Sequence, residues 1–150
     1  MISLDANLLL YAVNIASPFH QRAIQFLESL IKRDDVGVSE LVLVEFYTLL
    51  CNPAVLTKPL CPSDAVAIVQ TYRSHPQWSL LGFAADTVAL HEELWRVAAR
   101  ANFARRRIYD ARLALILLQQ GVTEFATANV KDFMGFGFHR VWNPLEEPGK

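Results

Sequence analysis

The chain has 150 residues, an apolar fraction of 53%, a charged fraction of 19% and a formal net charge of −1. A chain of this length can bury a sizeable core, and we predict a single domain over residues 1–150. The near-neutral charge excludes a global electrostatic field that would attract nucleic acid, so any such binding must come from local arginines or lysines.

The cysteine content and the amino terminus indicate where the protein works. Cys51 and Cys61 are too few for a disulfide framework in a chain of this length. The first residues lack a basic region and Asp5 interrupts their apolar run, so they do not read as a signal peptide. No uncharged apolar stretch reaches the roughly 18–20 residues that a membrane helix needs. We therefore expect a soluble protein of the cytoplasm.

Short apolar strands alternate with amphipathic helices along the chain. Ser17, Ser39, Ser63 and Asp86 are predicted N-caps, and Pro18 is predicted at the first position of its helix. The predicted strands cover residues 1–4, 36–38, 78–83, 124–127 and 139–142. The predicted helices cover 8–13, 18 to the break at 34–35, 40 to about 52, a stretch from 64, a stretch from 87, and 110–120.

This alternation, without a hairpin signal between strands, predicts an α/β fold with a parallel sheet covered on both faces. In such sheets ligands bind beyond the carboxyl ends of the strands, where the strand order reverses. Asp5 and Asn129 both lie just beyond the end of a predicted strand. We therefore expect the functional site at that edge of the sheet.

Three isolated acids, Asp5, Glu45 and Asp110, lie in apolar stretches of the sequence. Carboxylates are almost never fully buried without a partner, and one divalent cation would serve all three. Oxygen ligands with few histidines favour Mg²⁺ or Mn²⁺ over zinc. Such an ion lowers the pKa of bound water and neutralises charge on a phosphate, which indicates metal-assisted phosphodiester hydrolysis.

Each acid also has a purely structural interpretation. Asp5 and Asp110 could each cap the helix that follows them. The apolar neighbours of Glu45 argue against a solvated face, and a salt bridge to the basic loop at residues 105–107 is its alternative. Because each of these interpretations needs a separate partner, the shared cation is the simpler hypothesis.

Four segments, taken in order, resemble the PIN-domain family, and specifically the VapC-type toxins of bacterial toxin–antitoxin pairs. They are Leu4-Asp5-Ala6-Asn7, Ser39 through Glu45-Phe46, Tyr109-Asp110-Ala111-Arg112-Leu113-Ala114, and Thr127-Ala128-Asn129-Val130-Lys131-Asp132-Phe133. The resemblance runs over essentially the whole chain. It implies a three-layer α/β/α sandwich with a parallel sheet of about five strands in the order 3-2-1-4-5. It also implies an endoribonuclease dependent on Mg²⁺ or Mn²⁺, a VapB-like antitoxin as partner, and a homodimer.

The resemblance also implies roles for individual residues. Asp5 and Asp110 would be direct metal ligands, and Glu45 would complete the primary shell or orient metal-bound water. Asn7 would hold Asp5 or that water. Thr127 would hydrogen-bond within the pocket, or simply end its strand.

The segment around Thr127 departs from the family pattern in one respect. The family often has a fourth acid there, and in this chain that position looks like Asn129, with Asp132 three residues further on. An amide oxygen can ligate a hard cation but contributes no charge. This departure leaves the occupancy of a second metal site open.

Arginines near the third acid are candidates for the substrate surface. Arg105, Arg106 and Arg107 directly precede Asp110, and phosphate contacts by arginine dominate affinity for nucleic acid. Arg112 is a weaker candidate of the same kind. The alternative is that these arginines solvate a loop or pair with nearby acids.

Two other classes of protein compete with the nuclease. One is a catalytically silent PIN-like module that binds RNA or protein, for which Asn129 is the best support. The other is a signalling receiver domain, which needs a phosphoacceptor aspartate at the end of a middle strand. The second and third predicted strands end at Ser39 and near Phe83, which argues against a receiver.

Overall fold

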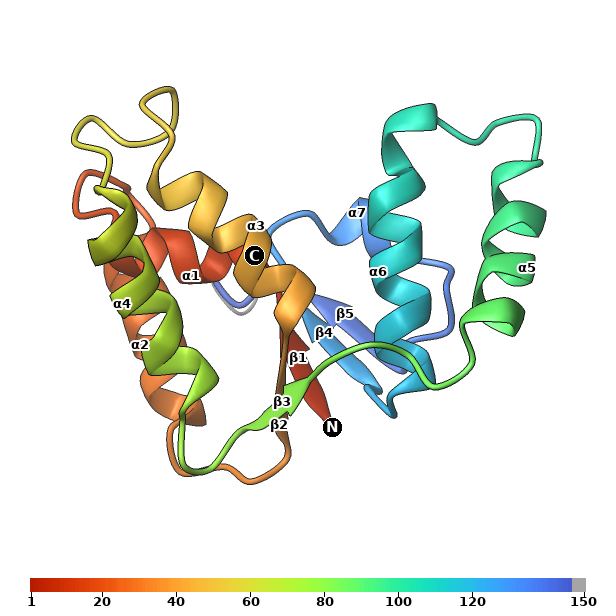
Figure 1. Ribbon diagram of the computed structural model, residues 1–150, viewed down its shortest axis with the longest axis horizontal. Coiled ribbons are helices and arrows are strands. Elements are labelled where there is room, and N and C mark those ends of the chain that lie inside the picture. The colour runs from red at the N-terminus through yellow and green to blue at the C-terminus, as the bar shows by residue number, and fades with distance from the viewer. Residues whose placement is uncertain (147–150) are drawn as a thin grey trace.

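The computed structural model describes residues 1–146 and shows a parallel five-stranded sheet between two layers of helices (Figure 1). The strand order is β3-β2-β1-β4-β5, and every neighbouring pair is parallel. The strands are β1 (Ile2–Leu4), β2 (Val36–Ser39), β3 (Ser79–Leu81), β4 (Glu124–Ala126) and β5 (Arg140–Trp142). The predicted fold class and strand order are confirmed, while residues 147–150 of the predicted domain lie outside the described residues.

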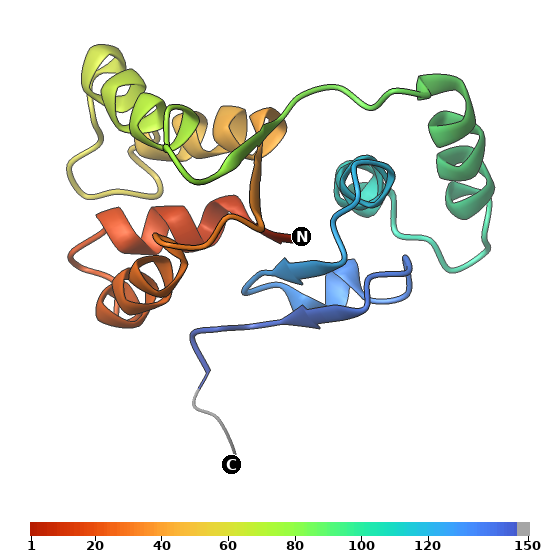
Figure 2. The same cartoon turned by 90° about the horizontal axis from the view of Figure 1, so that it is seen from below.

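The helices divide into two groups according to the direction in which the chain crosses the sheet. Crossovers from β1 to β2 and on to β3 move one way, and those to β4 and β5 move the other way. Because such crossovers are right-handed, α1 to α4 cover one face and α5 to α7 the other (Figures 1 and 2). The helices are α1 (Ala6–Val13), α2 (His20–Leu30), α3 (Glu40–Leu50), α4 (Pro62–Arg73), α5 (Thr87–Ala98), α6 (Ile108–Gln119) and α7 (Val130–Phe133), with a 3₁₀ turn, η1 (Arg105–Arg107).

The central strand β1 is buried along its whole length, as expected for a parallel strand covered on both faces. Leu4, Phe46 and Phe125 are among the large side chains that have no exposed surface. Gly37 allows β2 to pack closely, because a Cβ there would lie 2.6 Å from Met1 Sδ and 2.8 Å from Leu81 Cδ1. No helix within residues 1–146 is long and apolar enough to cross a membrane.

Two of the predicted N-caps are confirmed. Ser39 Oγ accepts a hydrogen bond from the backbone N–H of Leu41 at 3.2 Å, and Asp86 Oδ1 accepts one from Ala89 at 2.9 Å. Each satisfies an N–H that the first turn of a helix leaves without a partner. Ser39 also ends β2, so one residue both ends the strand and starts α3.

The other two predicted caps are wrong. Ser17 Oγ accepts from the N–H of Phe19 in a turn, and α2 begins only at His20, so Pro18 lies outside the helix. The helix α4 begins at Pro62 with Cys61 in the N-cap position, so Ser63 lies inside the first turn.

Three further segments differ from the sequence-based prediction. The strand expected over 78–83 is shortened to Ser79–Leu81, and Trp78 just before it donates from Nε1 to the carbonyl of Leu30 at 3.0 Å. The basic loop at 105–107 forms the 3₁₀ turn η1 that leads directly into α6. The short helix α7 was not predicted.

Candidate active site

Asp5 lies at the carboxyl end of β1 and is held by three hydrogen bonds. Its Oδ1 accepts from the backbone N–H of Ala6 at 2.8 Å, so it caps α1. Its Oδ2 accepts from Asn7 Nδ2 at 3.0 Å and from the hydroxyl of Thr127 at 2.6 Å. The structural interpretation of Asp5 as a cap is therefore correct, and it coexists with a place in a cluster of acids. Asn7 and Thr127 both contact it, as predicted.

The carboxylate of Asp5 is nearly inaccessible, with 6% of the residue exposed. Burial raises its pKa above the ordinary value, and the hydrogen bonds from Thr127, Ala6 and Asn7 act in the opposite direction. The negative charge of Asp132 raises the pKa further. No arginine, lysine or histidine among the described residues forms an ion pair with Asp5.

Asp110 lies in the first turn of α6 and is half-buried. The N-cap position of α6 is Arg107, so the interpretation of Asp110 as a helix cap is wrong. Burial is the main cause that raises the pKa of Asp110 to about 6, followed by the charges of Asp132 and Asp5. The guanidinium of Arg107 partly opposes this increase.

Glu45 lies on α3 and is exposed, so the expectation that it avoids a solvated face is wrong. Leu43 and Phe46 point to the core from other sides of the helix, whereas Val44 is exposed like Glu45. Within residues 1–146 it forms no salt bridge, which removes the alternative based on the basic loop.

The pKa of Glu45 is nevertheless raised, first by desolvation and then by the charges of Asp5 and Asp110. The influence of Asp5 and Asp110 places the carboxylate of Glu45 within electrostatic range of both. Figure 1 shows α3 on one side of the carboxyl edge of the sheet, with α6 and α7 on the other.

Asp132 of α7 is the fourth acid of this cluster. Its charge raises the pKa of both Asp5 and Asp110. Arg107 holds it from one side: Nη2 donates to the Asp132 carbonyl at 2.9 Å, and Nε lies 3.8 Å from Oδ1. The sequence favours Asn129 over Asp132 for the fourth position, although the acid stands three residues further along, in the first turn of a helix.

Asn129 is exposed and occupies the N-cap position of α7 without a side-chain capping bond. Its backbone N–H donates to the hydroxyl oxygen of Thr127 at 3.0 Å, and that hydroxyl in turn donates to Asp5. The observed connection between Asn129 and the acids therefore runs through its backbone. Its predicted role as a ligand stays a prediction.

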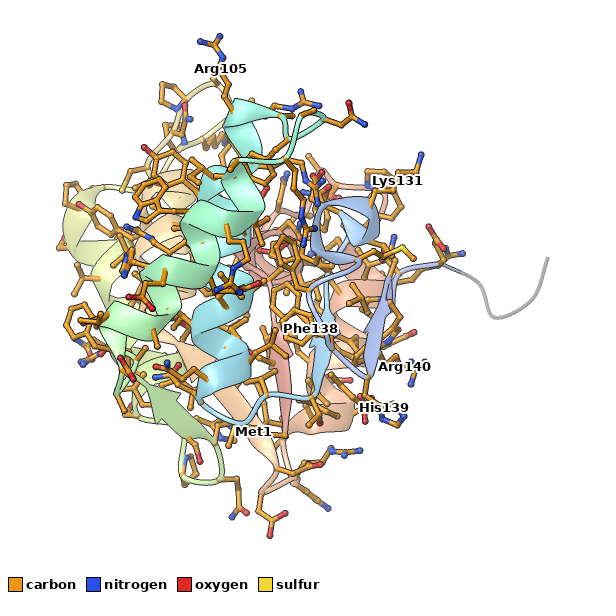
Figure 3. The ribbon with its side chains drawn as sticks, turned by 90° about the vertical axis from the view of Figure 1, so that its right-hand side faces the viewer. Met1, Arg105, Lys131, Phe138, His139 and Arg140 are labelled. Atoms are coloured by element: carbon orange, nitrogen blue, oxygen red, sulfur yellow. The ribbon has the colours of Figure 1, made fainter. Side chains whose placement is uncertain are left out.

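The predicted substrate-binding arginines lie in different surroundings. Arg105 and Arg106 are exposed, whereas Arg107 is engaged with Asp132. Figure 3 shows Arg105 extending outward towards the same end of the molecule as Lys131, opposite Met1 at the amino edge of the sheet. Arg112 lies over the ring of Tyr109, with 5.9 Å between the guanidinium carbon and the ring centre.

The four acids provide the hard oxygen donors that Mg²⁺ and Mn²⁺ prefer, with one arginine beside them. As the side chains stand, no three acids, histidines or cysteines in the described part of the chain are close enough to hold one ion. Their charges nevertheless act on one another, and the backbone brings all four to one edge of the sheet. Of the four acids Glu45 is the exposed one, so its carboxylate can change rotamer to approach the other three. The donor chemistry fits a divalent cation.

The parallel sheet in this order, with four acids beyond its carboxyl edge, defines a PIN-like α/β protein. The model of the family described as "PIN domain" matches residues 2–133. The chain belongs to the PIN-domain family, among the VapC ribonucleases. It is 47% identical over 149 residues to Ribonuclease VapC24 of Mycobacterium tuberculosis, with 99% of this chain and 100% of that relative covered.

Solved structures share the fold at lower sequence identity. VapC20 of Mycobacterium tuberculosis, described as a sarcin–ricin loop cleaving toxin, has a TM-score of 0.65 and 22% identity, covering 92% of this chain and 96% of its own. VapBC2 from Rickettsia felis, bound to a DNA fragment from its promoter, has a TM-score of 0.66 and 18% identity, covering 95% and 98%. At these identities the likeness shows the fold alone. The match of the PIN-domain model to residues 2–133 is what excludes the receiver-domain alternative.

Proposed function

We propose that this protein is a divalent-metal-dependent endoribonuclease and the toxin of a toxin–antitoxin pair. The observation that carries the proposal is the convergence of the charges of Asp5, Glu45, Asp110 and Asp132 at the carboxyl edge of a PIN fold. The full-length identity with Ribonuclease VapC24 supports RNA as the substrate. The electrostatic cost of gathering these acids is what a bound Mg²⁺ or Mn²⁺ would relieve.

The roles of the acids follow from their surroundings. Asp5 and Asp110 would hold the metal, Asp5 in a fixed orientation because three hydrogen bonds lock its carboxylate. Glu45, being exposed, would orient the attacking water, and Asp132 would supply the fourth charge where the family pattern pointed to Asn129. When bound, the metal would lower the pKa of water and neutralise charge on the attacked phosphate.

The remaining residues would position the acids or the RNA. Asn7 and Thr127 keep Asp5 in place, and Arg107 orients Asp132 through its carbonyl and its carboxylate. Arg105 and Arg106 are free to approach RNA phosphates, since they are exposed and beside α6.

The test is RNA cleavage with Mg²⁺, with Mn²⁺ and with a chelator. Asp5→Asn and Asp110→Asn should each lose activity by orders of magnitude while remaining folded. Asp34→Asn, an exposed aspartate in the turn before β2, is the matched control and should cut normally. Cleavage that persists in chelator or in either site variant would contradict the proposal.

A cognate antitoxin is the proposed partner, because one of the solved relatives is a VapBC complex. Expression of the chain alone should arrest growth, and co-expression of a small protein encoded beside it should restore growth.

A catalytically silent binding module is the second candidate, favoured by Asn129 at the position where the family often has an acid. Binding of RNA without cleavage under any metal would select it. A homodimer and a cytoplasmic location remain predictions.

A further inference from the structure

A small cavity of about 220 Å³ lies beside the cluster of acids, between the end of α5, η1 and the loop after α7. Its walls include two arginines, two phenylalanines, an asparagine and a methionine: Arg100, Asn102, Phe103, Arg107, Met134 and Phe136. We call this the flanking cavity. It is smaller than the roughly 300–1,000 Å³ of pockets that bind drug-sized ligands, which limits its occupant to about one flat ring system.

The flanking cavity combines apolar and basic groups and has no acid in its lining. Phe103 and Phe136 are half-buried, so part of each ring is covered by protein while the rest faces the cavity. The guanidinium of Arg107 lies 6.0 Å from the centre of the Phe136 ring. Gly135, at a φ of +87°, lets the chain turn sharply after α7 and bring Phe136 to this wall.

Arg107 connects this cavity to the acids. It lines the cavity, donates to the carbonyl of Asp132 at 2.9 Å, and acts on the charge of Asp110. Its Nε is buried, and none of the residues 1–146 accepts a hydrogen bond from it. Its ion pair with Asp132, at 3.8 Å from Nε to Oδ1, holds the guanidinium at the wall of the cavity.

We propose that the flanking cavity binds one unpaired nucleobase of the RNA, next to the phosphate that is cut; this rests on the proposed function. Aromatic rings offer a stacking surface that any base can use, and arginine adds cation–π attraction and hydrogen bonds. A base within a duplex is already stacked and paired. The cavity therefore selects single-stranded segments such as loops, whose bases can turn outward.

The experiment measures base binding without requiring cleavage. Amide NMR signals of the full-length protein are followed as AMP, GMP, CMP or UMP is added, with ribose 5-phosphate as the probe that lacks a base. At least one nucleotide should shift the signals of Phe103, Gly135 and Phe136 saturably, and ribose 5-phosphate should not. Phe136→Ala should weaken that binding roughly 5- to 150-fold, the range for losing one base–aromatic stack.

Because Phe136 also packs against the core, Arg100→Gln provides a second variant on an exposed position. It should weaken nucleotide binding severalfold, whereas Arg96→Gln, in the last turn of α5 and outside the cavity, should leave it unchanged. Equal shifts with ribose 5-phosphate, shifts located elsewhere, or no shifts with any nucleotide would overturn the inference. If the protein cuts RNA but binds no base in this cavity, only the present inference is wrong. If it binds bases in this cavity without cutting RNA, only the proposed function is wrong.

Discussion

The hydroxyl of Thr127 donates a 2.6 Å hydrogen bond to Oδ2 of Asp5, which is 122 residues away in the sequence. The bond follows from the register of the sheet. Leu4 of β1 is paired with Ala126 of β4, so the next residue on each strand emerges at the same edge. Thr127 is completely buried and also accepts from the N–H of Asn129. It therefore links α7 to the carboxylate at the centre of the cluster.

Replacing Thr127 by valine keeps the volume of the side chain and removes its hydrogen bonds. Because a bond to a carboxylate contributes roughly 1.5–3 kcal/mol, Thr127→Val should lower the free energy of unfolding by about 2 kcal/mol. The pKa of Asp5, which this bond lowers, should rise further. Urea unfolding at pH 7 measures the first effect, and carboxyl NMR titration the second.

The control for this prediction is Thr57→Val, on an exposed threonine in the loop before α4. Its stability should stay within about 0.5 kcal/mol of the wild type. Equal stability of the two variants would mean that the bond between Thr127 and Asp5 contributes nothing measurable.

The sequence predicted the edge of the sheet at which the acids gather, because that depends on local patterns. Asp5 follows an apolar strand directly, and its position was predictable from the alternation of strands and helices. The caps Ser39 and Asp86 were predictable for the same reason, since each precedes a helix whose hydrophobic periodicity is clear in the sequence. Ser17 failed because a local turn to Phe19 competes for its hydroxyl.

Features that depend on packing between distant segments were not predictable. The exposure of Glu45 depends on what covers α3, which its apolar neighbours in sequence do not reveal. The pairing of Arg107 with Asp132 joins η1 to α7 over 25 residues. Because of this pairing Arg107, which was expected to contact phosphates, also positions the carboxylate of Asp132. The flanking cavity is likewise formed by three segments that show no shared motif.

At Gly37 an added Cβ would meet two side chains that pack against the sheet. Gly37→Ala would place a Cβ 2.6 Å from Met1 Sδ and 2.8 Å from Leu81 Cδ1. The neighbours must shift, and overpacking of this kind costs about 1–3 kcal/mol. Gly82→Ala is the matched control, because a Cβ there meets nothing within 4 Å. Denaturant unfolding should show a clear loss for the first variant and none for the second; the reverse order would contradict the described packing of β2.

The raised pKa of Asp110 predicts how stability depends on pH without metal. Between the ordinary value of 3.8 and the folded value of about 6, the folded protein binds more protons than the unfolded chain. The free energy of unfolding should therefore fall as pH rises from 4 to 6 and then level off. Asp110→Asn should remove this fall and gain about 1 kcal/mol at pH 7 after discounting for solvent screening.

Thermal unfolding in chelator at several pH values measures this effect, with Asp34→Asn as the control. RNA cleavage should show the opposite dependence, rising with pH through about 6 as Asp110 loses its proton. A stability that increases from pH 4 to pH 6 because of Asp110 would be incompatible with the described environment.

Arg107 should affect catalysis differently from its neighbour Arg105. In Arg107→Gln the pKa of Asp110 should rise, because the guanidinium now lowers it, and Asp132 should lose its anchor. The acid limb of the pH–rate profile should move to higher pH, and kcat should fall about 10-fold or more. Arg105→Gln, on an exposed arginine of the same turn, should raise KM, reduce the salt dependence of RNA binding and leave the pH profile unchanged. Identical effects of the two variants would show that Arg107 acts only as a phosphate contact.

Metal binding should be visible as stability even without RNA. A cation that binds only the folded protein adds about 2.7 kcal/mol at one hundred times its dissociation constant, so Mn²⁺ should raise the melting temperature relative to chelator. The gain should be largest at pH 7, where the acids are ionised, and small near pH 4. Asp132→Asn should reduce the gain, because its charge acts on both Asp5 and Asp110, while Asn129→Ala should reduce it less. The comparison decides whether Asp132 or Asn129 is the fourth ligand. A larger loss of Mn²⁺ stabilisation in Asn129→Ala would assign that role to the amide. Equal stability with and without Mn²⁺ would mean that no metal binds at this edge of the sheet.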